Sequence, residues 1–191
     1  MSQLSGSPGL GAELLRERLA FRSVNRRDSP GFESGLQRHH LLPCQLLSRR
    51  CFGRFLHAVG TERIGFNDFR SNGLLLPAND ITAIRIGLPL HRGPHRTYNE
   101  LVIERVGQIE AGWAAQRLRA PEVAVRDAQQ RLDLLQRALR RRLLDQQRRP
   151  LALNRRDPLG RSIDFNELDA MAATLWPATA LADAGAIQAG F

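Results

Sequence analysis

Apolar residues recur at helical spacing in two stretches of the N-terminal half. The pattern predicts one helix over residues 12–21 and a second over 44–60, which ends at Gly60. Turn-forming residues fill the connection at 26–35. In the second helix, the side chains expected to be buried are Leu46, Leu47, Phe52, Phe55 and Leu56.

The C-terminal half carries two longer apolar patterns. One predicts a helix that opens near Gly93 and Pro94 and runs past Trp113, and the other predicts a helix over 121–149. The second has leucines three and four residues apart, which we expect in the core as part of a helical hairpin or one kinked rod: Leu132, Leu135, Leu139 and Leu143. A further short helix is expected after an N-cap at Asp164.

Two short apolar runs between these helices predict β-strands. The first is "HHLLP" at 39–43, and the second is "LLLP" at 74–77. Asn72 and Gly73 precede the second strand and tolerate the positive φ angles of a turn. Residues 78–90 are interpreted as a variable link. The chain is therefore expected to be an α+β protein that is mostly helical, with one small β-hairpin.

Composition adds a strong charge preference to this picture. The chain has 191 residues, enough for about one compact unit, and its formal net charge is +9. All 28 basic residues are arginines, whose planar guanidinium groups bind phosphate well. A surplus of this size attracts polyanions. The sequence shows no cleavable signal peptide and no apolar run of membrane-spanning length, so we expect a protein that is cytoplasmic or exported without such a signal, and no membrane partner.

Histidines provide the candidate chemistry. His39 and His40 are adjacent, and in a strand their rings point to opposite faces, so one can bind a metal ion while the other serves elsewhere. His91 and His95 are four residues apart, and on the first turn of a helix they could share an ion. His57 is interpreted as a structural or surface residue.

The order of these motifs resembles the HNH/endonuclease VII superfamily. The matching pieces are "RHHLLP", "NGLLLP" and "HRGPHRTYNELV", within residues 37–106. The branch that the chain resembles most is named for an Ala-His-His motif and occurs among bacterial toxin nucleases; here Arg38 stands in place of the alanine. The resemblance implies a ββα-metal core at 37–118, after an N-terminal segment at 1–36 with a flexible start and a helix, and before a helical extension with long accessory helices at 119–191.

The resemblance also implies roles for individual residues. His39, His91 and His95 would hold one divalent metal ion, and His40 would be the general base that activates water. Asn72 would hold the base-bearing segment in place through hydrogen bonds. The residues expected to contact nucleic acid are Arg38, Arg92 and Arg96.

These roles describe a metal-dependent endonuclease that hydrolyses phosphodiester bonds, in DNA or RNA, with little sequence specificity. The ion could be Zn, Mg, Mn or Ni, and a toxin nuclease would need a small acidic immunity protein as partner. A phage or housekeeping enzyme is the other possibility for such a nuclease. The alternative is a non-catalytic basic module that binds nucleic acid or protein, with a structural zinc site closed by Cys44 or His57 as fourth ligand.

Overall fold

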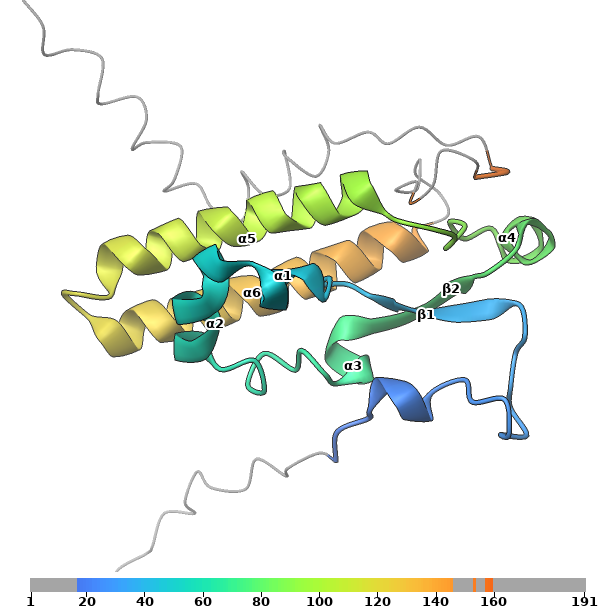
Figure 1. Ribbon diagram of the computed structural model, residues 1–191, viewed down its shortest axis with the longest axis horizontal. Coiled ribbons are helices and arrows are strands. Elements are labelled where there is room, and N and C mark those ends of the chain that lie inside the picture. Colours follow the sequence, from blue (N-terminus) through green and yellow to red (C-terminus); the bar gives the residue numbers. More distant parts are fainter. Residues whose placement is uncertain (1–16, 146–152, 154–156, 160–191) are drawn as a thin grey trace, which may run out of the picture.

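The computed structural model describes residues 17–145, 153 and 157–159. A small antiparallel β-hairpin lies beside a group of helices, and the two longest helices run alongside each other (Figure 1). The elements are β1 (Leu36–His40), α1 (Gln45–Ser48), α2 (Gly53–Val59), α3 (Phe69–Asn72), β2 (Gly73–Pro77), α4 (Asp80–Ile86), α5 (Arg96–Gln116) and α6 (Pro121–Leu144), with single 3-10 turns at Phe21–Ser23 and Arg50–Phe52. The predicted α+β class, mostly helical with one hairpin, is confirmed.

The β-hairpin is formed by β1 and β2, with His39 opposite Leu74 and His40 opposite Gly73. β1 covers residues 36–40, so the strand predicted at 39–43 was placed too late; the residues at 41–43 are buried after the strand has ended. Gly73 has a φ of −110°, so it is not needed for a positive φ. A Cβ at this position would lie 2.1 Å from the Phe69 ring, and glycine is therefore required for space.

The helix predicted over 44–60 is broken. Arg49 has an extended backbone (ψ 114°) between α1 and the 3-10 turn that precedes α2. Leu47, in α1 before the break, is 49% exposed although it was expected in the core. The helix predicted at 12–21 is not present at residues 17–20: Ala20 forms an isolated bridge with Asp68. Residues 12–16 lie outside the described part.

Residues 80–86 form α4, in a segment that was interpreted only as a variable link. The Asn79 side chain accepts a hydrogen bond from the backbone N–H of Thr82 and caps the helix at its N-terminus. Gly87 ends it in the left-handed conformation, with φ 68°. Both capping signals are present in the sequence, but the helix has only seven residues and its Ile81 and Ile84 are exposed. Its apolar pattern therefore does not mark a buried face.

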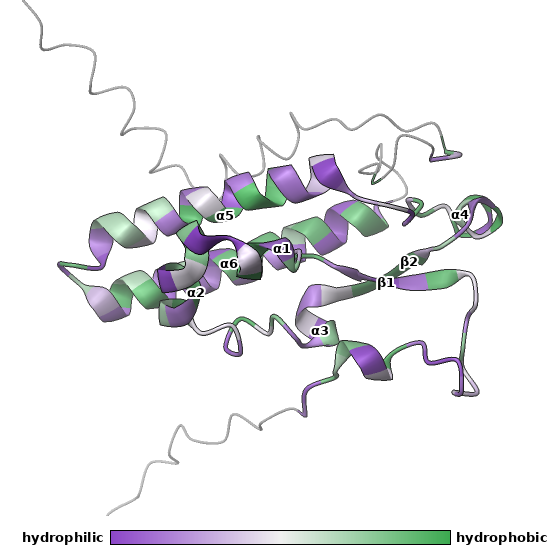
Figure 2. Ribbon diagram, viewed as in Figure 1, coloured by the Kyte–Doolittle hydropathy of each residue, from purple (hydrophilic) through white to green (hydrophobic). Residues whose placement is uncertain are grey.

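The helices α5 and α6 form a helical hairpin, the first of the two predicted arrangements, and not one kinked rod (Figure 1). The four leucines predicted for the core of α6 are all at most 3% exposed. Figure 2 shows hydrophobic and hydrophilic residues alternating along both helices, as expected for helices with one buried face. α6 ends at Leu144; positions 146–149 of the predicted helix and the helix expected after Asp164 lie outside the described residues.

Polar side chains of α6 connect this helix to the segments around the β-hairpin. Gln129 donates a hydrogen bond to the carbonyl of Val59, and Arg140 donates one to the carbonyl of Arg70 at 2.6 Å. The cluster of buried apolar residues includes side chains from α2, α5, α6 and β2. None of the described helices is both long enough and apolar enough to span a membrane.

Candidate metal centre

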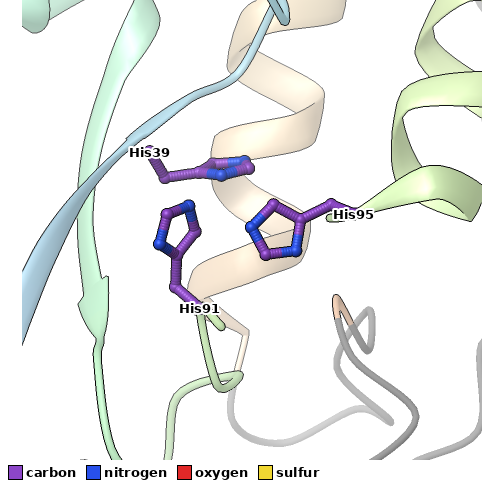
Figure 3. Close-up of side chains that lie close together, drawn as sticks. All are labelled: His39, His91 and His95. Carbon is purple, nitrogen blue, oxygen red and sulfur yellow. The ribbon is translucent and has the colours of Figure 1, made fainter. Parts of the chain in front are cut away.

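Three histidines from separate parts of the fold converge on one point (Figure 3). His39 comes from β1, His91 from the loop before α5, and His95 is the N-cap residue of α5. One ring nitrogen from each lies within 4.8 Å of the others. The structure thus brings together the three residues predicted as metal ligands. Among the described residues, no other group of three histidine, cysteine or acidic side chains has this proximity.

His39 lies deepest in the cluster. The alternation of β1 turns its ring away from solvent, and the residue is only 3% exposed. The ring contacts His91, His95 and Tyr98 edge to face, with centroids 5.0, 5.7 and 4.9 Å away. Its buried Nε2 atom has no hydrogen-bond partner. A buried polar atom without a partner is costly, and a metal ion between the three rings would satisfy it.

His91 and His95 do not lie on one helical turn, as the sequence had suggested. Helix α5 begins only at Arg96, and the backbone N–H of His91 donates to the carbonyl of Pro77 (2.7 Å), which continues the edge of the hairpin. Gly93, with φ 78°, turns the chain between the two histidines. The loop still brings their rings to a centroid distance of 4.4 Å.

Acceptors outside the cluster orient two of the rings. Nδ1 of His95 lies 3.2 Å from the backbone carbonyl of Leu153, and Nδ1 of His91 lies 3.2 Å from Oε1 of Gln37. A carbonyl oxygen can only accept, so each Nδ1 carries the proton in these pairs. The lone pair of each neutral ring is then on Nε2, the nitrogen left for a metal ion. Such outer contacts commonly fix the orientation of metal-binding histidines.

Ionisation of the cluster also suits a metal ion. Burial, followed by the charges of neighbouring histidines, holds the pKa of His39 well below its usual range. Burial and the proximity of His95 lower the pKa of His91 to about 4, and burial lowers the pKa of His95. All three rings are therefore neutral near pH 7 and can act as ligands. Three imidazoles fit a divalent cation that keeps coordination positions open.

His40 lies on the other face of β1. Its ring stacks on Phe21, with centroids 3.7 Å apart and planes 3° from parallel. Burial, and then the charge of Arg38, lower its pKa below the usual value. The imidazole is therefore neutral at physiological pH and able to accept a proton.

Asn72 is fully buried directly before β2. Its Oδ1 accepts from the backbone N–H of Leu42 (2.7 Å), and its Nδ2 donates to the carbonyl of Leu42 (3.1 Å). Its backbone carbonyl accepts from Leu41 at 2.8 Å. Through these hydrogen bonds, Asn72 holds the backbone of Leu41 and Leu42, which follow His40. Its own side chain is buried and does not reach solvent.

The three arginines expected to contact nucleic acid are all exposed. Arg38 stands in β1 and donates a hydrogen bond to the carbonyl of Phe21 (2.9 Å). Arg92 lies in the loop between the two histidines, and Arg96 is the first residue of α5. His57 is exposed on α2 and is not part of the histidine cluster.

Sequence reasoning missed residues that support the site from outside. Gln136 of α6 donates to Oδ1 of Asn72 (3.3 Å), and Asp157 accepts from the backbone N–H of Leu90 (3.2 Å), next to His91. Gln37 is the third. Gln37 could have been suspected from its place two residues before His39 on the same strand face. No sequence signal marks the other two, because they act over 64 and 67 residues.

Comparison with known protein families decides the family. Residues 21–138 match the AHH family, described as a nuclease family of the HNH/ENDO VII superfamily with conserved AHH. The chain belongs to the AHH family. It is therefore a nuclease, and nucleases of this superfamily use a divalent metal ion. Searches of curated proteins and of solved structures returned no significant match.

Within this AHH nuclease, the motif that names the family reads Arg38-His39-His40. The Arg38 side chain is exposed and does not belong to the group of converging histidine nitrogens, although, after burial, its charge also lowers the pKa of His40. The alternative of a structural zinc site needs a fourth protein ligand. Neither Cys44 nor His57, the two candidates, belongs to the group of converging nitrogen atoms.

Proposed function

We propose that this AHH nuclease is an endonuclease that hydrolyses DNA with little sequence specificity, with His39, His91 and His95 as ligands of one divalent cation and His40 as general base. The observation that carries the proposal is the buried, unpartnered Nε2 of His39 between two further neutral imidazoles. When bound there, the cation would supply Lewis-acid stabilisation of the negative charge that develops on the phosphate.

Residues of the chain carry out the proton transfer from water and hold the general base in place. The neutral His40 ring takes a proton from water as its oxygen bonds to phosphorus. The bond between phosphorus and the 3′ oxygen breaks, and that oxygen takes up a proton and leaves as a hydroxyl group, so that a 5′-phosphate remains. Stacking on Phe21 limits the orientations of the His40 ring. Asn72 fixes the backbone after His40 and is a positioning residue, since its side chain is enclosed.

The opposite directions of His39 and His40 constrain where the substrate can lie. Both rings can act on one phosphate only if the nucleic acid crosses an edge of β1. In the described sheet, one edge of β1 is paired with β2, and the other edge is not part of a ladder. The unpaired edge of β1 is therefore the place for the scissile phosphate, with Arg38, Arg92 and Arg96 as candidates for contacts to neighbouring phosphates.

The proposal is tested with purified protein on supercoiled plasmid DNA. We expect nicking and degradation with a divalent cation and complete loss of cleavage in EDTA. Binding to duplex DNA should weaken steeply as salt rises and vary little with sequence, because arginines act on phosphates through counterion release. Equal cleavage in EDTA would exclude the proposed centre. Cleavage of RNA in place of DNA would change the substrate and leave the centre intact.

The acidic immunity partner and the toxin role are a separate part of the proposal. They rest on the resemblance to toxin nucleases and on the formal net charge of +9, which an acidic protein would complement. The neighbouring reading frame should then encode a small acidic protein that binds this chain and stops plasmid cleavage. A neighbour that leaves cleavage unchanged would favour a phage or housekeeping enzyme.

A further inference from the structure

A cavity of about 600 Å³ lies between the N-terminal loop and β1. This volume is within the range of pockets that enclose small organic ligands. We name it the arginine cavity, after its charged lining: Arg22, Arg26, Arg27, Arg38 and Asp28. Four arginines against one aspartate give a net charge of +3. The lining is therefore suited to anions.

The loop that carries the arginines is held in shape by Asn25. This residue has a positive φ of 50°, and its Nδ2 donates to the carbonyls of Glu33 and Leu36 at 2.9 Å each. Its Oδ1 accepts from the backbone N–H of Glu33 at 2.8 Å. One side chain thus closes the loop onto the start of β1. Guanidinium groups on a closed loop lose less conformational freedom on binding than groups on an open one.

The charged side chains that line the cavity differ in whether they have an ion-pair partner. Arg26 forms a two-pronged pair with Asp28, and this pair holds the pKa of Asp28 below its usual range. Arg38 is engaged by a backbone carbonyl, which does not neutralise its charge. Arg22 and Arg27 have no ion-pair partner within the described part of the chain. These two are the groups best placed to accept an anion.

The arginine cavity adjoins the histidine centre along β1. Gln37 lines the cavity, and its Oε1 contacts Nδ1 of His91. Arg38 also lines it, although consecutive residues of a strand point to opposite faces. A cavity that is lined by both must lie at an edge of the strand. Gln37 is only two residues, about 7 Å along the strand, from His39.

We propose that the arginine cavity binds the sugar-phosphate backbone of the substrate strand beside the phosphate that is cleaved. The inference rests on the proposed function and extends it, because it assigns Arg22 and Arg27 to phosphates that flank the reacting one. Planar guanidinium groups bind phosphate oxygens in pairs, without reading the base sequence. The cavity would thereby supply affinity and register while the histidines act on the neighbouring phosphate.

The test compares two double variants of the full chain that remove the same charge. Arg22→Gln with Arg27→Gln removes the proposed contacts. Arg119→Gln with Arg126→Gln is the control, since both residues are exposed and lie at or just after the α5–α6 turn, away from the β-hairpin (Figure 1). Binding to duplex DNA is measured in EDTA over a range of salt concentrations. Hydrolysis with a divalent cation is measured on DNA and on bis(4-nitrophenyl) phosphate, a diester without flanking phosphates.

The cavity variant should make the negative slope of log affinity against log salt less steep by about 1.8, or about 0.9 for each lost phosphate contact, and should lower kcat/KM on DNA by about tenfold. Its kcat/KM on bis(4-nitrophenyl) phosphate should equal that of the parent. The control should keep the parent's slope and both rates. A cavity variant with the control's slope overturns the inference, and so does an equal loss on both substrates. If the parent hydrolyses neither substrate, the proposed function fails, and the slope still tests the cavity on its own.

Discussion

The helical hairpin and the histidine centre are held together by different forces. α5 and α6 meet through fully buried leucines and aromatic side chains such as Leu139 and Trp113. The centre is assembled from a strand, a loop and one helix end, and its contacts are hydrogen bonds and ring contacts between polar groups. Apolar burial contributes most of the stability of a fold, whereas a polar centre depends on satisfied partners. Stability and chemistry can therefore be changed separately in this protein.

The largest effect is expected at His40. Loss of a general base lowers rates by about 10²–10⁴-fold, so His40→Ala should lose nearly all cleavage and keep the parent's affinity for the metal ion. His95→Ala should lose both metal binding and cleavage, and excess metal should restore part of the activity. Calorimetric metal titration and a plasmid-nicking assay separate the two. His57→Ala is the control and should change neither. Lost metal binding in His40→Ala, with full activity in His95→Ala, would contradict the assignment.

A substitution that leaves an empty space in the core of the helical hairpin should lower stability and leave cleavage unchanged. Leu139 is fully buried, and Leu139→Ala should lower the free energy of unfolding by about 2–5 kcal/mol. Cleavage per folded molecule should stay at the parent's level. Urea unfolding followed by circular dichroism gives the first quantity, and a nicking assay well below the transition gives the second. The matched control is Leu144→Ala, since Leu144 is 42% exposed and should change stability by less than about 0.5 kcal/mol.

A smaller effect on metal binding is expected at Asp157, which lies outside the histidine cluster. Asp157→Ala removes the acceptor for the backbone N–H of Leu90, next to His91, and should weaken metal binding by about tenfold. Asp157→Asn keeps an amide oxygen and should lose less. Metal affinity is measured directly by calorimetry. Asp133→Ala on the exposed surface of α6 serves as control; equal affinities in the two alanine variants would remove Asp157 from the support of the centre.

The smallest effect on the fold is expected when the metal ion is removed, although cleavage should be lost. The helices α5 and α6 contribute many side chains to the buried apolar cluster, so EDTA should leave the helical circular dichroism signal and cooperative unfolding in place. The melting temperature should fall only by the linkage contribution of the bound ion. Collapse of the helical signal in EDTA would instead identify a structural zinc site.

The sequence predicted the local parts of this fold and missed the long-range ones. The buried leucines of α6 were confirmed, because apolar spacing is a local signal. The convergence of His39, His91 and His95 is a long-range feature, and it was expected only from the resemblance to the nuclease superfamily. The catalytic and ligand roles of these residues, and the domain boundaries, stay predictions.

The errors have physical reasons. Helix propensity does not reveal the extended backbone at Arg49, which allows α1 and α2 to pack separately. The loop position of His91 is fixed by its hydrogen bond to Pro77, a tertiary contact that spacing cannot show. α4 was missed because it has only seven residues, and its Ile81 and Ile84 are exposed and do not form a buried face.

The hydrogen bond from Gln136 to Asn72 has a consequence for how the enzyme is made. The two residues are 64 positions apart, so the bond cannot exist until the ribosome has added most of α6. At about 5–20 residues per second, translation from Asn72 to Gln136 takes roughly 3–13 s. The contact between His95 and Leu153 closes later still, over 58 residues. During this interval the nascent chain already carries Asn72 without its hydrogen bond from Gln136, and His95 without its contact to Leu153.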